Sequence, residues 1–191
     1  MARQRGTASA GATQLRPPTE AENPDPEADP TSSAHTICLR LLAVRSRTRA
    51  ELASALQARN IPDPAAESVL SRLERVKLID DAAFATDFVA SRRVERGLSA
   101  REIARQLRTK GVAPDIIEAA LAEVDEGAEY ETARALGERK LRSMARLDPA
   151  VQTRRLAGQL ARKGYAPQLV YRVVRELIGT AQLGDAVEAG F

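Results

Sequence analysis

Two adjacent carboxylates, Asp80 and Asp81 in the segment LIDDAAFATDF, are the residues of this chain that come closest to a catalytic or metal-binding pair. Neighbouring carboxylates occur in two-metal sites and in acid–base catalysis. Adjacent residues at a helix start point to different sides, however, and no third ligand follows at a suitable spacing. Asp80 suits an N-cap, and Asp81 suits the positive end of the helix dipole. We interpret the pair as a helix start, with a metal or acid–base site as the alternative.

The single histidine and the single cysteine offer no further catalytic chemistry. His35 has no carboxylate partner at helical spacing, and we expect it at the surface or in a cap. Cys38 lies among Ile37, Leu41 and Leu42, where a small buried thiol is expected rather than a nucleophile. The chain also lacks a P-loop, a dinucleotide-binding glycine set and zinc-ligand spacing. We therefore predict a protein that is not an enzyme and needs no metal or cofactor.

Basic residues recur at helical spacing and form the main candidate binding surface. In residues 98–110, Arg101, Arg105 and Arg108 fall within one arc, opposite Ile103 and Leu107. The other candidates are Arg92, Arg93, Arg96, Lys110, Arg139, Arg142, Arg146, Arg155, Arg162 and Lys163. Arg139, Arg142 and Arg146 are expected on one face of a single helix. Such faces bind acidic proteins or nucleic acid, although solvated helix faces have the same composition. Tyrosines that could stack on bases are few, so any nucleic acid should be held through its phosphates.

Composition limits the class of protein that carries these faces. Of the 191 residues, 43% are hydrophobic, only 3% are aromatic and none is Trp, which favours a helical core of Leu, Ile, Val and Ala. One cysteine excludes an internal disulfide, and no apolar run approaches the roughly 18 residues of a membrane span. The net charge of +3 combines an acidic, Pro-rich head with a basic body. We expect a cytoplasmic all-α protein with a disordered N-terminal tail over residues 1–30.

The chain repeats itself, since ARQLRTKGVAP at 104–114 returns as AGQLARKGYAP at 157–167. An earlier copy aligns without a gap: Leu52 and Leu56 correspond to Ile103 and Leu107, then to Leu156 and Leu160. The residue that ends the helix is Asn60, Gly111 or Gly164. A period of about 50 residues leaves room for a third helix per copy, over 34–45, 80–95 and 127–146. We predict an elongated, curved array of three three-helix repeats, at 31–78, 79–125 and 126–179, followed by a C-terminal tail at 180–191.

These features resemble the RecX family, regulators of the RecA recombinase. The resemblance covers roughly residues 34–178 and is most specific in LIDDAAFATDFVASRRVERGLSAREIARQLRTKGV and LARKGYAPQLVYRVV. It implies docking in the groove of the RecA filament on DNA, with inhibition of strand exchange, ATP hydrolysis and coprotease activity. It also implies roles for Arg92, Arg96 and Arg101, and for the turns Lys110–Gly111 and Lys163–Gly164.

The chain departs from the family pattern at two turns. Asn60 and Lys77 stand where the family often has glycine. Asn tolerates the left-handed backbone conformation, whereas Lys77 would be strained if its φ is positive.

Two other functions remain open. A helix-turn-helix transcriptional regulator would also fit helix, short turn and helix, as in RAELASALQARNIPDPAAESVLSRL. Its recognition helix should begin with polar side chains for base edges, whereas Pro64, Ala65 and Ala66 begin this one, and Leu169 and Val170 begin its counterpart. The second possibility is a helical-repeat scaffold for an unrelated partner. Nothing in the sequence demands a dimer, and we expect a monomer.

Overall fold

The structure is a computed structural model that describes the backbone of residues 29–188 and the side chains of residues 29–179. Most of the predicted N-terminal tail, residues 1–28, lies outside the described residues. Within the described range the chain forms nine α-helices and no strand, which confirms the all-α prediction. Their bounds are α1 Pro30–Val44, α2 Arg49–Gln57, α3 Asp63–Arg75, α4 Asp81–Arg96, α5 Ala100–Thr109, α6 Pro114–Leu121, α7 Glu126–Arg142, α8 Pro149–Arg162 and α9 Pro167–Glu188.

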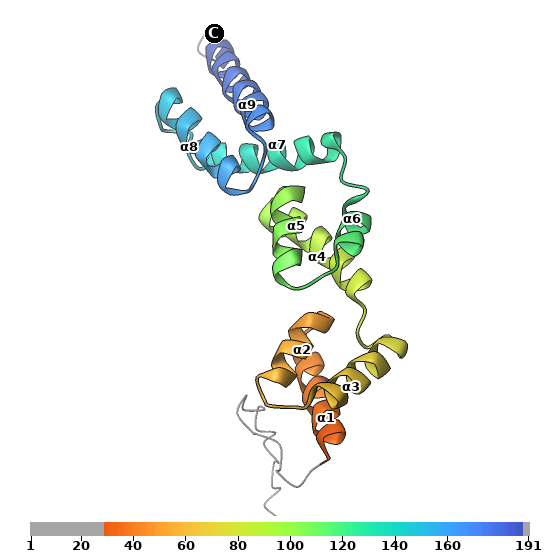
Figure 1. The fold of residues 1–191 in the computed structure, drawn as a ribbon. Helices are drawn as coiled ribbons and strands as arrows, with labels where there is room; N and C mark the ends of the chain where they lie inside the picture. Colours follow the sequence, from red (N-terminus) through yellow and green to blue (C-terminus); the bar gives the residue numbers. More distant parts are fainter. Residues whose placement is uncertain (1–28, 189–191) are drawn as a thin grey trace, which may run out of the picture.

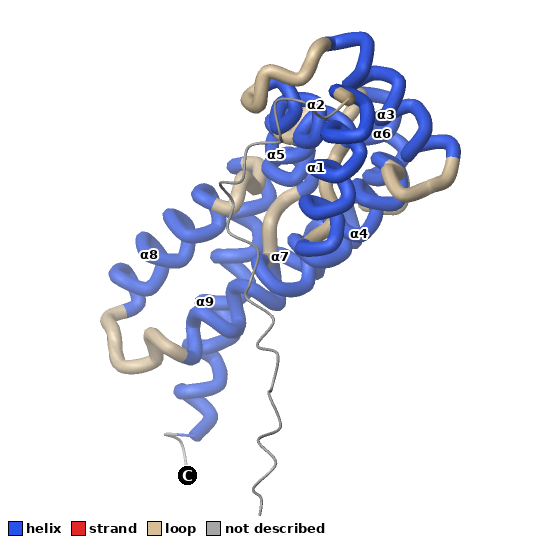
Figure 2. Tube along the Cα trace, turned by 90° about the horizontal axis from the view of Figure 1, so that it is seen from below, coloured by secondary structure: helices blue, strands red, loops and turns tan. Residues whose placement is uncertain are grey.

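The helices form three units that follow one another along a curved, elongated body, as predicted (Figure 1). The first unit, α1–α3, lies at one end, and the third, α7–α9, lies at the other. A view from below shows the same separation of the two ends (Figure 2). We call these units the first, second and third repeats.

Each repeat has its own apolar core, because the buried side chains separate into three clusters. The central pair of each cluster is the pair that the sequence alignment matched. Leu52, Leu56, Ile103, Leu107, Leu156 and Leu160 are all fully buried. The predicted correspondence of these positions is therefore confirmed. The second repeat differs slightly, because α6 is the shortest helix of the described range and buries Ile117, while Ala120, Leu121 and Val124 are only partly buried.

The turn after the middle helix of each repeat has the predicted left-handed residue. The φ angles are 57° at Asn60, 76° at Gly111 and 90° at Gly164. In each turn the next amide donates back to the helix, as Val112 N–H does to the Leu107 carbonyl at 3.1 Å. Lys77 also has positive φ, 60°, so the strain expected for a lysine there is present.

The helix starts are set by short polar side chains. Asp80 caps α4, since its carboxylate accepts from Ala83 N–H at 3.0 Å, which confirms the interpretation of this residue as an N-cap. Asp29 caps α1 ahead of Pro30, so this helix begins inside the segment assigned to the tail. At the other end, α9 continues to Glu188, through most of the segment expected as a C-terminal tail.

Helix α8 begins one turn earlier, relative to its core leucines, than α2 and α5 do. Asp148 caps α8, whereas Thr48 and Ser99 cap the other two. Gln152 stands at the position of Thr48 and Ser99, and its amide donates to the carbonyls of Met144 and Leu147, both at 3.0 Å. The chain between α7 and α8 therefore folds against this side chain.

Candidate binding interface

The first and second repeats meet where the start of α2 contacts the end of α5, a contact that we call the first joint. The Thr48 hydroxyl donates to the Lys110 carbonyl at 2.6 Å and accepts from Glu51 N–H at 3.1 Å. The Lys110 ammonium reaches Glu51 at 2.7 Å. Asp81 adds a third contact, since its carboxylate accepts from Arg49 N–H at 2.9 Å. Partial burial raises the pKa of Asp81.

The second joint brings together the corresponding elements, the start of α5 and the end of α8, through a backbone donor instead of a hydroxyl. Ser99 N–H donates to the Lys163 carbonyl at 3.0 Å, and the Ser99 hydroxyl accepts from Glu102 N–H at 3.1 Å. The buried Tyr165 hydroxyl donates to the Gly97 carbonyl at 3.1 Å. Burial raises the pKa of Tyr165, so it stays a neutral donor.

The joints explain why two of the three turns need glycine. A Cβ on Gly111 would lie 2.2 Å from the Ala50 Cβ, and a Cβ on Gly164 would lie 2.5 Å from the Ser99 Oγ. Positive φ and close approach thus both exclude a side chain. Asn60 belongs to the first repeat, and within residues 29–188 no other repeat stacks on its turn. Positive φ is the only demand at that turn, and asparagine meets it.

Three of the candidate basic residues are engaged inside the molecule. The Arg93 guanidinium donates to the Ala128 carbonyl at 2.8 Å and to the Thr132 hydroxyl at 2.9 Å, which ties α4 to α7. The Arg92 guanidinium lies over the Phe88 ring, 4.5 Å from its centroid. The Lys110 ammonium is paired with Glu51 and lies 5.8 Å from the same ring centroid.

On α5 the predicted arginine face forms, but its central member is paired. Arg105 makes two hydrogen bonds to Glu102, at 2.8 and 2.7 Å. These bonds lower the pKa of Glu102 to about 2. Arg101 and Arg108 are exposed, and within the described part of the chain neither guanidinium group has an ion-pair or hydrogen-bond partner.

The second joint brings the end of α8 close to the start of α5. Arg155 and Arg162 are exposed on α8. Lys163 closes that helix, and its carbonyl binds the start of α5 next to Arg101. The joint therefore places the start of α5, which carries Arg101, beside the end of α8, which carries Arg162. We call Arg101, Arg108, Arg155 and Arg162 the α5–α8 face.

The basic residues of α7 do not share one helix face as predicted. Helix α7 ends at Arg142, so Arg146 lies in the following turn. In this turn Met144 packs in the third core, where it is 6% exposed. The Met144 N–H donates to the Leu141 carbonyl at 2.8 Å, which closes the turn. Arg139 instead borders a hollow between α4 and α7 that Arg93 also lines. Arg96, Arg139, Arg142 and Arg146 are all exposed.

The described residues offer little that resembles a catalytic site. No group of three or more His, Cys, Asp or Glu side chains in residues 29–179 could hold a metal ion. Cys38 is fully buried in the first core, and burial raises its pKa to about 11. No helix of the described range is both long and apolar enough to span a membrane.

Comparison with known families decides what this array is. Three family models match in chain order: the first three-helix domain of RecX over residues 34–73, the second over 80–121 and the third over 128–174. The chain belongs to the RecX family. The match spans α1 to α9 and leaves the first 33 residues outside.

Relatives named "Regulatory protein RecX" are similar over most of their length. The protein of Streptomyces coelicolor is 51% identical over 170 residues, which cover 86% of this chain and 90% of the relative. That of Mycobacterium avium is 47% identical over 160 residues, covering 83% and 90%.

Solved RecX structures share the fold. The crystal structure of RecX from Lactobacillus salivarius superimposes with a TM-score of 0.67 at 21% identity, over 78% of this chain and 97% of that one. A second crystal structure of a regulatory protein RecX gives 0.64 at 24% identity, over 78% and 72%.

Sequence reasoning missed the residues that join the RecX repeats. Thr48 and Ser99 each stand three residues before a glutamate, in TRAE and SARE, which is the capping-box spacing. That signal predicts both caps. It does not predict that the caps also bind the next repeat.

Proposed function

We propose that this protein binds the RecA filament on DNA and inhibits its recombinase, ATPase and coprotease activities, and so modulates recombination, DNA repair and the SOS response. Membership of the RecX family is the observation that carries this proposal. We further propose that it acts in the cytoplasm as a monomer, without a cofactor, and that each repeat is one structural domain.

The tandem array suits a helical filament because a filament presents the same surface at regular intervals. Three similar repeats held by two similar joints can make several weak contacts at once. Each contact raises the effective concentration for the next, so inhibition needs less than one molecule per RecA protomer.

The α5–α8 face is the part of the basic surface that we assign to the filament or to the DNA backbone. Its four arginines are exposed, and their positive charge complements acidic side chains or phosphates. We assign supporting roles to Arg105 and Lys163 beside this face, and to Arg96, Arg139, Arg142 and Arg146 beyond it. Arg93 and Lys110 link different helices and so position these residues, whereas Arg92 packs on Phe88 of its own helix.

The helix-turn-helix alternative has less support from the geometry. The third helix of the first repeat begins with Asp63 and Pro64, and that of the second begins with Pro114 and Asp115. The carboxylates at these positions repel phosphate, and neither aspartate nor proline side chains donate hydrogen bonds to base edges.

The ATPase rate of RecA on single-stranded DNA, titrated with this protein at less than one molecule per protomer, tests the proposal. We expect inhibition that the double variant Arg101→Glu, Arg108→Glu weakens at least about tenfold. The matched control reverses Arg72 and Arg75, which are exposed on α3. No inhibition of a cognate RecA by the unmodified protein would refute the function, whereas equal inhibition by both variants would refute only the assignment of the face.

A further inference from the structure

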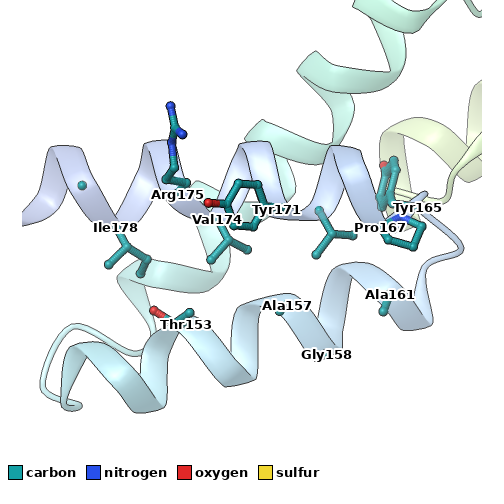
Figure 3. Close-up of a pocket in the computed structure, with 12 residues that line it drawn as sticks. Thr153, Ala157, Gly158, Ala161, Tyr165, Pro167, Tyr171, Val174, Arg175 and Ile178 are labelled. Atoms are coloured by element: carbon teal, nitrogen blue, oxygen red, sulfur yellow. The ribbon is translucent and has the colours of Figure 1, made fainter.

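A groove of about 770 Å³ lies between α8 and α9 in the third repeat (Figure 3). Tyr165, Val170, Val174 and Ile178 line it, and each is less than 10% exposed. Ala157 lines it from α8. Among the described residues that line the groove, none is acidic. The lining therefore favours an apolar ligand.

The apolar lining is specific to the third repeat rather than a property of the repeat fold. A smaller hollow occupies the same place between α2 and α3. Three groove residues of the third repeat are Gly158, Ala161 and Tyr171. The corresponding residues are Ser54, Gln57 and Glu67 in the first repeat, and Arg105, Arg108 and Glu118 in the second. Only the third repeat combines two small residues on one wall with an aromatic residue on the other.

Tyr171 shows that the groove is open to a partner. It is 68% exposed although it borders an apolar surface. The folded monomer does not need an aromatic side chain at this place, because the core beneath is already closed by Val170 and Val174. Exposed aromatic residues beside an apolar groove are typical of interaction sites.

The rim of the groove is basic. Arg154 and Arg162 lie one turn to either side of Gly158 on α8, and the Arg162 guanidinium lies 3.4 Å from where a Cβ on Gly158 would be. Arg175 borders the groove on α9, with its guanidinium pointing away from α8 (Figure 3). All three side chains are exposed. An apolar interior with a basic rim complements an apolar ridge flanked by carboxylates.

We propose that this groove is a docking site for an acidic amphipathic helix of a protein partner. The α8 wall, residues 153–161, is about 12 Å long, which matches two turns of a docked helix with anchors at i, i+4 and i+7. The carboxylates of that helix pair with Arg154, Arg162 and Arg175. Single-stranded nucleic acid fits less well, because the lining is mainly aliphatic and offers few rings for base stacking. The proposal does not depend on the identity of the filament partner, and Arg162 belongs both to this rim and to the α5–α8 face.

Tryptophan fluorescence tests this proposal directly, because the chain contains no tryptophan. Tyr171→Trp places a single reporter on the groove. The probe is a synthetic amphipathic helix with leucines on one face and glutamates on its flanks. We expect a saturable blue shift that added salt weakens. Two control peptides replace the leucines with serine or the glutamates with lysine, and each should bind at least about tenfold more weakly.

A filled-groove variant supplies the protein control. Gly158→Arg with Ala161→Arg, made together with Tyr171→Trp, copies the residues that the second repeat carries at these positions. Ala161→Gln copies the first repeat and serves if the double change lowers the melting temperature. We expect binding of the acidic helix to fall at least about tenfold in the filled groove.

Absence of a fluorescence shift with the acidic helix would overturn the proposal, and so would equal affinity of that helix for the filled-groove variant. A shift with an oligonucleotide but not with the helix would point to nucleic acid instead. A shift that grows with protein concentration, without any added peptide, would point to a second copy of the chain.

Discussion

The Thr48 hydroxyl donates to the Lys110 carbonyl at 2.6 Å, and these two residues are separated by 62 positions in the sequence. Thr48 is fully buried, and the same hydroxyl caps α2 through Glu51 N–H. A cap that normally serves one helix therefore also binds the end of a helix in the next repeat. At the first joint, local helix formation and repeat stacking are therefore coupled through one side chain.

Replacing Thr48 with valine removes this hydroxyl while it keeps the branched shape. We expect the free energy of unfolding to fall by about 1–2 kcal/mol, because a cap and a buried hydrogen bond are lost together. Urea denaturation followed by circular dichroism measures the change. Thr36→Val is the matched control, since the Thr36 hydroxyl binds only the Ser32 carbonyl on an exposed face of α1. Equal effects of the two changes would contradict the role of Thr48 in the joint.

Gly111→Ala should lower the free energy of unfolding far more than a change at the corresponding Asn60. The new Cβ would meet the Ala50 Cβ at 2.2 Å in a backbone of positive φ. Steric overlap and strain together should cost about 2–4 kcal/mol. Asn60→Ala meets only the strain and should cost at most about 1 kcal/mol. The same denaturation series compares them, and similar losses would show that the joint does not press on Gly111.

Lys77→Gly should stabilise the protein by about 1 kcal/mol, because glycine adopts a φ of 60° without the strain that lysine carries. Lys77→Ala is the informative control. Alanine keeps the strained backbone and loses the contact of the Lys77 ammonium with Asp80 at 3.3 Å. We expect a higher melting temperature for the glycine variant only. A higher melting temperature in both variants would show that loss of the Lys77 charge, and not relief of strain, stabilises the protein.

Cys38 should resist thiol reagents in the folded protein. Burial raises its pKa from 9.0 to about 11, so the folded state favours the neutral thiol. The contribution of this group to stability is thus fully present below pH 9 and decreases as pH rises from 9 towards 11, where the unfolded chain ionises first. Labelling with a thiol-reactive dye at pH 8 should be slow and should accelerate with urea. In the Cys38→Ala variant, the free energy of unfolding should fall less between pH 9 and 11 than in the unmodified protein. Fast labelling without urea would contradict a closed first core.

Much of the fold could be predicted because the repeats share local chemistry. Leu52, Ile103 and Leu156 recur with their turn residues, and both patterns depend only on neighbours along the chain. The proposed binding surface was harder to predict, because the repeats must dock before it is known which basic side chains stay exposed. Arg93 looks like any basic residue until α7 supplies the Ala128 carbonyl. Ala161 likewise gives no signal by itself, since a small residue marks a groove only when the opposite helix is in place.

The early start of α8 changes the surface that Thr48 and Ser99 provide in the first two repeats. In the first two repeats the residue at this position, Thr48 or Ser99, receives the turn of the following repeat. In the third repeat Gln152 already holds the chain between α7 and α8. At the opposite end, Asn60 carries the side chain that the joints exclude at Gly111 and Gly164. Neither Gln152 nor Asn60 thus reproduces the contacts by which the described repeats stack, so the two outer surfaces of the described array differ from its inner joints.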